Sequence, residues 1–189
     1  MREIIYFSRN ARTSGNFNDL MKAGRMDIVC HVIIMSFFVS NNIRENVKLH
    51  LFFYGAPDPP KHLEIMANRN ISKKDVAGLI KRMLYKYKKG RKIEAFENCF
   101  VEKNSLIKVV EELAKTRNVY LLDRNGENIR KTEIKENPIF ILGDHEGLPK
   151  KELRRIGKNA IKISLGKVNY FSSQIITILN NELDIRGIN

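Results

Sequence analysis

Cysteine is scarce in this 189-residue chain. The two cysteines, Cys30 and Cys99, have no close spacing, which excludes a disulfide framework and argues against a cysteine-bound zinc site. No His-x-x-x-His or His-Glu-x-x-His pattern occurs either, so the sequence predicts no metal centre. This cysteine usage fits a reducing compartment, and we expect the protein to be cytoplasmic.

Long apolar segments are also missing. The longest one, from Ile28 to Val39, is interrupted by His31 and Ser36 and is too short to cross a bilayer, so it predicts a buried helix. The first 15 residues lack the apolar core of a signal peptide. No Gly-x-Gly-x-x-Gly or Walker pattern occurs, which argues against a standard dinucleotide or nucleoside triphosphate site.

Acidic residues are the scarcer charge, with 21 Asp and Glu against 34 Lys and Arg and a net charge of +13. This balance favours a polyanionic partner, usually nucleic acid, over the alternative of a solvated lysine-rich surface. Between Lys73 and Lys92 there are nine basic residues against one acidic residue, with Tyr85 and Tyr87 among them. The predicted RNA-binding residues within this segment are Lys81, Arg82, Lys86, Lys88, Lys89 and Arg91.

The order of the expected elements indicates one α/β domain over residues 1–189, with a mainly parallel sheet flanked by helices. Helical patterns cover residues 25–40, 72–89, 106–114, 149–156 and 172–183. Strand patterns cover residues 2–7, 47–54, 62–66, 92–101, 118–122, 138–142 and 161–165. The sequence Asp-Arg-Asn-Gly at 123–126 predicts a turn.

Three of these strands end in segments that are typical of a ligand site. Residues 137–148 read Asn-Pro-Ile-Phe-Ile-Leu-Gly-Asp-His-Glu-Gly-Leu, an apolar strand that runs into three ionisable side chains. A second segment follows Leu122, and a third runs from Leu165 to Tyr170. Because the carboxyl ends of parallel strands meet at one edge of a sheet, we expect the three segments to form one site. Ordinary strand-to-helix turns remain the alternative.

Charged residues near these ends are candidates for chemistry. Asp144, His145 and Glu146 could act as general bases or metal ligands, although neighbours on a turn point in different directions. The alternative is that Asp144 or Glu146 accepts backbone N–H bonds. Arg25 begins a predicted helix, where the dipole disfavours a cation, which indicates that it binds a phosphate or a carboxylate. A surface arginine paired with a nearby acid, such as Asp27, is the alternative.

Several blocks of the sequence closely resemble the archaeal tRNA pseudouridine N1-methyltransferase family of the SPOUT class. They include residues 137–148, Ala23–Asp27, Tyr54–Pro60 and Ile163–Gly166, and they occur in register along nearly the whole chain. The resemblance implies a deep trefoil knot over roughly residues 117–189, a homodimer and S-adenosylmethionine (SAM) as cofactor. It also implies tRNA as the partner, methylated at nitrogen 1 of pseudouridine 54.

The resemblance further assigns site residues. Such a methyl transfer needs a carboxylate that takes the proton of the base and a cation that holds a phosphate or the developing negative charge, so Arg25, Asp27 and Asp144 are the candidate catalytic residues. Ile175 replaces a cysteine that lies near the cofactor in relatives. The implied cofactor-binding residues are Leu122, Gly143, Leu165, Gly166, Lys167, Val168, Asn169, Tyr170 and Ile175. Two other functions stay open: methylation of ribosomal RNA or of a ribose 2′-hydroxyl, and RNA binding without catalysis.

Overall fold

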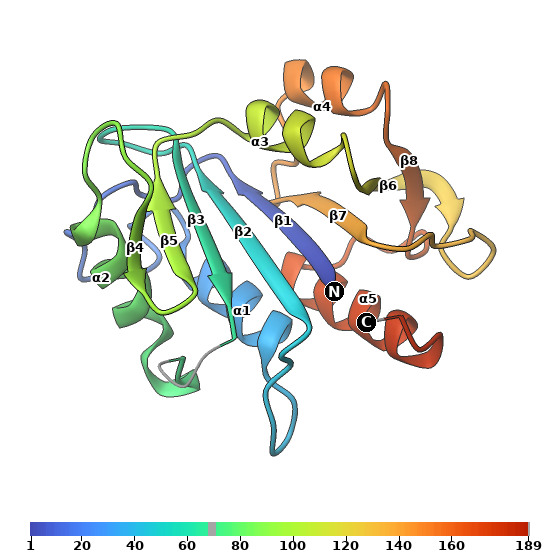
Figure 1. Cartoon of the computed structure of the whole chain (residues 1–189), viewed down its shortest axis with the longest axis horizontal. Coiled ribbons are helices and arrows are strands. Elements are labelled where there is room, and N and C mark those ends of the chain that lie inside the picture. Colours follow the sequence, from blue (N-terminus) through green and yellow to red (C-terminus); the bar gives the residue numbers. More distant parts are fainter. Residues whose placement is uncertain (68–70, 189) are drawn as a thin grey trace.

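The computed structural model of the chain describes residues 1–67 and 71–188. Figure 1 shows its strands and helices. The strands are β1 (Arg2–Ser8), β2 (Val47–Phe53), β3 (Lys61–Met66), β4 (Ile93–Phe96), β5 (Cys99–Glu102), β6 (Asn118–Asn128), β7 (Pro138–Gly143) and β8 (Ile161–Ser164). The helices are α1 (Met26–Phe37), the 3₁₀ helix η1 (Lys73–Asp75), α2 (Val76–Lys86), α3 (Leu106–Leu113), α4 (Lys150–Ile156) and α5 (Ser172–Ile185).

The described strands form a single sheet in the order β4-β5-β3-β2-β1-β7-β6-β8. Strands β2, β1, β7, β6 and β8 run parallel, while β3, β5 and β4 pair antiparallel at the other end. β1 is buried along its whole length and β7 along all but its last residue, as expected for apolar strands covered on both faces. The predicted α/β class with a mainly parallel sheet is confirmed.

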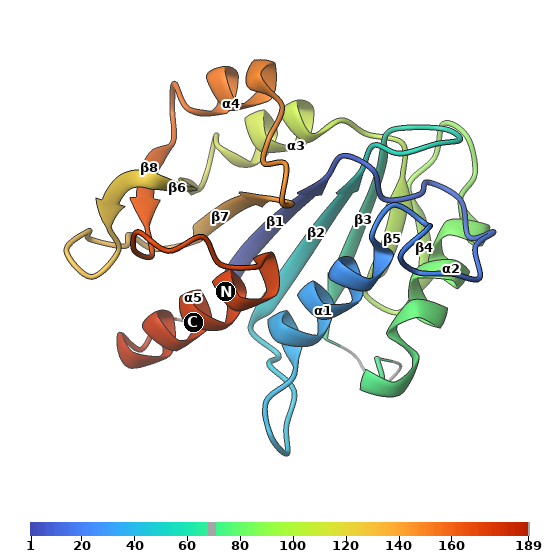
Figure 2. The same cartoon turned by 180° about the vertical axis from the view of Figure 1, so that it is seen from behind.

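Helices cover the two faces of the sheet in separate groups (Figures 1 and 2). α1, α2 and α5 share one hydrophobic cluster, to which α1 contributes Val29 and Ile33. α3 and α4 lie on the other face, where Val110 and Ile156 pack against Ile5 and Phe52 of the sheet. α1 is largely buried, as its nearly continuous apolar sequence predicts. None of the helices in the described residues is long and apolar enough to cross a membrane.

Three local predictions are wrong. Residues 123–126 do not end a strand, because β6 continues to Asn128. The strand instead shifts register there, so that Leu122 and Glu127 both oppose Ile163 of β8. A Cβ on Gly126 would lie 2.6 Å from the Ile163 nitrogen, so the approach of β8 requires glycine at this position. Helix α2 ends at Lys86, before Gly90, and the segment 92–101 holds two strands, β4 and β5.

Candidate active site

A pocket of about 720 Å³ lies where β7 and β8 end and β6 changes register. Its volume is in the range of small-molecule sites, roughly 300–1,000 Å³. All three segments predicted to share a site contribute to the wall, which confirms that they meet at one edge of the sheet. Of the predicted cofactor-binding residues, the wall contains Leu122, Leu165, Gly166, Val168, Asn169, Tyr170 and Ile175.

The other two predicted cofactor-binding residues, Gly143 and Lys167, are not part of the wall. A Cβ on Gly143 would lie 2.6 Å from the carbonyl carbon of Gly147, so the turn itself fills the space that the missing side chain leaves. The carbonyl oxygen of Gly143 accepts a hydrogen bond from the Ser172 hydroxyl at 3.1 Å. Gly143 therefore joins the turn to the start of α5. The Lys167 side chain is exposed.

The wall also contains residues that the sequence reasoning missed. Asp123 and Arg124 line the pocket because β6 does not turn away after Leu122. Their position directly after Leu122 was the signal that could have identified them. Phe171 lines the pocket too and is 70% exposed.

The Gly-Asp-His-Glu-Gly turn is fixed by the carboxylate of Asp144, which is 9% exposed. Its two oxygens accept hydrogen bonds from the backbone amides of Arg9, at 2.8 Å, and Glu146, at 2.9 Å. Glu146 in turn accepts a bond from the Asn10 side chain at 2.8 Å and pairs with the Arg9 guanidinium at 3.2 Å. His145 is exposed. The structure thus gives Asp144 the backbone-binding task that was its alternative interpretation.

Arg25 and Asp27 form an ion pair at the start of α1. The guanidinium donates two hydrogen bonds to the carboxylate, at 3.0 and 2.9 Å. Arg25 has a φ of 62°, a left-handed conformation that is uncommon for a residue with a side chain. The hydrogen bond from Arg25 lowers the pKa of the Asp27 carboxyl. Both side chains keep access to solvent, with 44% and 25% of their surface exposed. Neither lines the pocket.

Tyr6 of β1 is a buried residue whose phenol feels the charges of both candidate acids, and it was not predicted as a site residue. Its side chain is buried, and burial raises the pKa of its phenol. The charges of Asp144 and Asp27 raise this pKa further, while a hydrogen bond with Ser172 opposes the shift. The phenol therefore lies within the electrostatic reach of both carboxylates. In the sequence Tyr6 is one residue of an apolar strand, and no local pattern marks it.

The predicted RNA-binding segment on α2 is only partly available to a partner. Lys81 lies 4.9 Å from the centre of the Phe17 ring. Arg82 pairs with Asp75 at 2.8 Å, and Lys86 donates to the carbonyl oxygen of Ala95 at 2.6 Å. Lys88, Lys89 and Arg91 are exposed, and their side chains have no partner in the described part of the chain.

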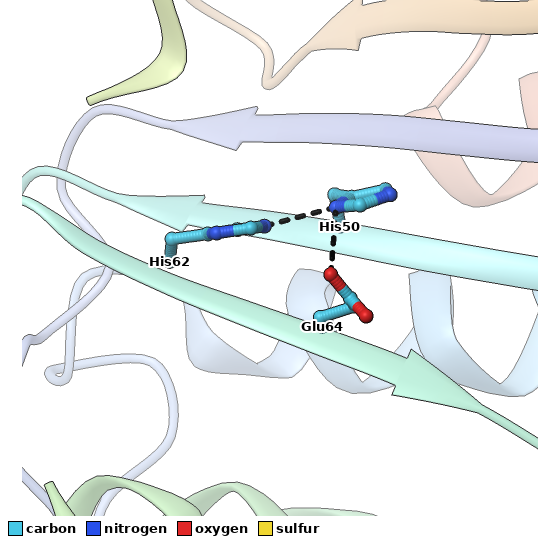
Figure 3. Close-up of side chains that lie close together, drawn as sticks. All are labelled: His50, His62 and Glu64. Atoms are coloured by element: carbon cyan, nitrogen blue, oxygen red, sulfur yellow. Dashed lines mark hydrogen bonds and ion pairs between the residues drawn. The ribbon is translucent and has the colours of Figure 1, made fainter. Parts of the chain in front are cut away.

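A cluster of possible metal ligands lies away from the pocket, on β2 and β3 (Figure 3). His50 Nδ1 is 2.9 Å from His62 Nε2 and 4.0 Å from a Glu64 oxygen. His62 also bonds Glu102 at 2.9 Å, and burial lowers the pKa of its imidazole to about 4. Lys48 and Lys92 balance the charge of Glu64, at 3.6 and 3.0 Å. Hydrogen bonds and ion pairs within the sheet therefore engage all three side chains, although His50 Nε2, 3.4 Å from a Glu3 oxygen, makes no hydrogen bond among the described residues.

Comparison with known proteins gives consistent matches. Residues 1–188 match a family described as "Putative SAM-dependent RNA methyltransferase". A Methanococcoides burtonii protein named tRNA (pseudouridine(54)-N(1))-methyltransferase is 32% identical, over 97% of this chain and 96% of that protein. One of the same name from Methanosarcina acetivorans is 34% identical, over 97% of this chain and 91% of that protein.

A solved structure has the same arrangement of strands and helices as this chain. The crystal structure of Archaeoglobus fulgidus Nep1 bound to S-adenosylhomocysteine matches with a TM-score of 0.61, over 91% of this chain and 76% of that chain. Its sequence identity of 17% means that this match describes the fold alone.

Proposed function

Because the chain belongs to the family of SAM-dependent RNA methyltransferases, we propose that it methylates nitrogen 1 of pseudouridine 54 in tRNA. The match to this family and to the named relatives confirms the resemblance found in the sequence. The choice of target is supported by the shared name of relatives that match over nearly their whole length. The observation that carries the proposal is the pocket, which the three segments form at one edge of the sheet.

The wall of the pocket suits a ligand with both apolar and polar parts. Leu122, Leu165 and Ile175 supply apolar surface, and Asp123 supplies an acidic side chain. Gly166 has a φ of 130°, and no atom lies within 4 Å of where its Cβ would be, so a ligand can approach the backbone there. When bound, SAM supplies a methyl group that its positively charged sulfur has already activated. We propose that the 165–170 loop, Leu122 and Ile175 hold SAM, and that Gly143 supports the wall from within its turn.

We propose catalytic roles for Arg25 and Asp27, and their ion pair bears on how they would act. Nitrogen 1 of pseudouridine must lose its proton to become methylated, and a carboxylate nearby could accept that proton. In the described structure the guanidinium of Arg25 makes Asp27 a weaker base. A phosphate of the RNA that engages Arg25 would release the carboxylate for this task. Asp144, with both oxygens bonded to backbone amides, acts in this proposal by fixing the turn.

We also propose a homodimer that works in the cytoplasm, where its substrate tRNA is found. Two large apolar side chains at the ends of α5, Phe171 and Ile185, are 70% and 72% exposed, which supports a covering partner. Sedimentation equilibrium would test the dimer. Lys88, Lys89 and Arg91 at the end of α2 remain proposed RNA contacts. The C-terminal knot and the single-domain boundary remain predictions.

One experiment tests the proposed reaction. The protein is incubated with SAM labelled in the methyl group and with tRNA transcripts that either carry or lack pseudouridine. We expect label only in the pseudouridylated RNA, and mass spectrometry of the nucleosides identifies the methylated atom. Label in both transcripts would indicate another target, such as a ribose 2′-hydroxyl. Absence of SAM binding at millimolar concentration would favour an RNA-binding protein without catalysis.

A further inference from the structure

Helix α4 carries a cationic surface that the sequence reasoning did not single out. We define the α4 basic surface as Lys150, Lys151, Arg154 and Lys158, all exposed, together with Lys162 of β8. Two surface hollows of about 400 and 410 Å³ lie along it and are lined mainly by these cations. Within residues 1–67 and 71–188, no acidic side chain pairs with Lys150, Lys151, Arg154 or Lys158. These four cations therefore offer unpaired positive charge to a partner.

The position of two of these lysines is unfavourable for the helix itself. Lys150 and Lys151 begin α4, where the helix dipole disfavours cations. The neighbouring Glu152 is the acidic residue that the first turn would favour. The charge of these two lysines therefore does not stabilise the helix through its dipole.

The α4 basic surface adjoins the pocket. Lys162 lines one of the hollows, and its amino group lies 3.4 Å from the carboxylate of Asp123, which lines the pocket. On the other side, only Leu148 and Pro149 separate the start of α4 from the Asp144–Gly147 turn, which is also part of the pocket wall. A nucleic acid bound along α4 would therefore pass next to the pocket.

The basic segment 73–92, which includes α2, lies away from the pocket. α2 and α4 cover opposite faces of the sheet (Figures 1 and 2). α2 packs beside β4 and β5, at the opposite end of the sheet from β8. The two end strands, β4 and β8, are seven strand spacings of about 4.8 Å apart, or roughly 34 Å measured along the sheet. Of the two basic clusters in one chain, α4 is the one beside the pocket.

We propose that the α4 basic surface binds the phosphate backbone of the substrate RNA and holds the target nucleotide at the pocket. The proposal rests on the proposed function and adds where the RNA lies. Lysine and arginine contacts to phosphates supply much of the affinity for nucleic acid and make it dependent on salt. Such contacts fix the register of the nucleic acid without reading its bases.

The test compares two variants of equal net charge. One carries Lys150→Gln, Lys151→Gln and Lys158→Gln. The matched control carries Lys108→Gln, Lys131→Gln and Lys135→Gln, three exposed lysines whose side chains also have no partner among the described residues. Binding of pseudouridylated tRNA transcript is measured by fluorescence anisotropy over a series of salt concentrations, without SAM.

For the α4 variant we expect the slope of log affinity against log salt to fall by roughly 2 to 3, about 0.9 for each lost phosphate contact. We expect its affinity in 0.1 M salt to fall at least about tenfold, and that of the control less than about threefold. At saturating RNA its methylation rate should stay near the wild-type rate, with the loss in KM and with SAM binding unchanged. The single variant Arg154→Gln should lower the slope by about one.

Wild-type affinity and slope in the α4 variant, or an equal loss in the control, would overturn the proposal. The binding measurement needs no turnover. If the wild-type protein fails to methylate pseudouridine, the proposed function fails while the test of the α4 basic surface still gives an answer. If the α4 variant binds RNA as tightly as the wild type but loses binding to an acidic protein, the α4 basic surface would instead bind a protein partner.

Discussion

Replacing Asp144 with asparagine would separate its two possible tasks, anchoring the turn and accepting a proton. The carboxylate accepts bonds from the backbone amides of Arg9 and Glu146, at 2.8 and 2.9 Å. Asparagine keeps one acceptor oxygen, but its amide nitrogen would then face the second N–H donor. A hydrogen bond to a charged group contributes about 1.5–3 kcal/mol to stability. We therefore expect Asp144→Asn to lower the free energy of unfolding by about 2–3 kcal/mol.

Thermal unfolding followed by circular dichroism measures this loss. For a domain of this size, 1 kcal/mol corresponds to about 2–4 °C in Tm, so the Tm should fall by roughly 4–12 °C. SAM should bind more weakly, because the turn is part of the pocket wall. Below the melting transition, and at saturating SAM and RNA, the single-turnover rate should stay within about tenfold of the wild-type rate.

Glu146→Gln is the matched control in the same turn. It removes the ion pair with Arg9 but keeps an oxygen for Asn10. A surface ion pair contributes about 0–1 kcal/mol, so its Tm should stay near that of the wild type. The reasoning on Asp144 is refuted if Asp144→Asn melts like the wild type while its single-turnover rate falls by about 10²–10⁴, the usual effect of losing a general base.

Three further predictions concern other parts of the molecule. Burial lowers the pKa of His62 to about 4 in the folded state, below the value of about 6.5 in an unfolded chain, so the unfolded state binds more protons between these values. The free energy of unfolding should fall by up to about 3 kcal/mol as the pH falls from about 6.5 to 4. Urea unfolding at several pH values measures this, and His62→Asn should make the free energy of unfolding depend less on pH. A wild-type free energy that does not change over this pH range would contradict the prediction. Gly143→Ala should lower the free energy of unfolding by about 1–3 kcal/mol, because the added Cβ would lie 2.6 Å from the backbone of Gly147. It should also weaken SAM binding measured by calorimetry, and an unchanged SAM affinity would contradict this role of the turn. Asp27→Asn should lower the single-turnover rate by about 10²–10⁴ with little change in Tm, and a full rate would place the proton acceptor elsewhere.

The sequence was sufficient to predict that three distant segments share one site. The prediction needed only the pattern of buried strands and the rule that parallel strands end at one edge of a sheet. It could not show what Asp144 binds, because the amide of Arg9 lies 135 residues away in sequence. The turn expected at residues 123–126 failed for a related reason. Its residues favour a turn locally, but pairing with β8 keeps them in the strand, and that pairing is a tertiary contact.

Charge density along the sequence also could not decide which basic segment is available to RNA. Residues 73–92 hold nine basic residues and one acidic residue, and residues 150–162 hold six basic residues and one acidic residue, so the two densities are nearly equal. The fold distinguishes them. On α2 itself, Arg82 and Lys86 are engaged by Asp75 and by a carbonyl oxygen, and the cations without a partner, Lys88, Lys89 and Arg91, lie after the helix ends and outside the pocket wall. Most cations of the α4 basic surface have no partner in the described residues and adjoin the pocket. An unpaired cation attracts phosphate with its full charge, and a paired one must first lose its partner. The net charge of +13 therefore predicts a polyanionic partner, but the pairing of each cation and its distance from the pocket determine where that partner lies.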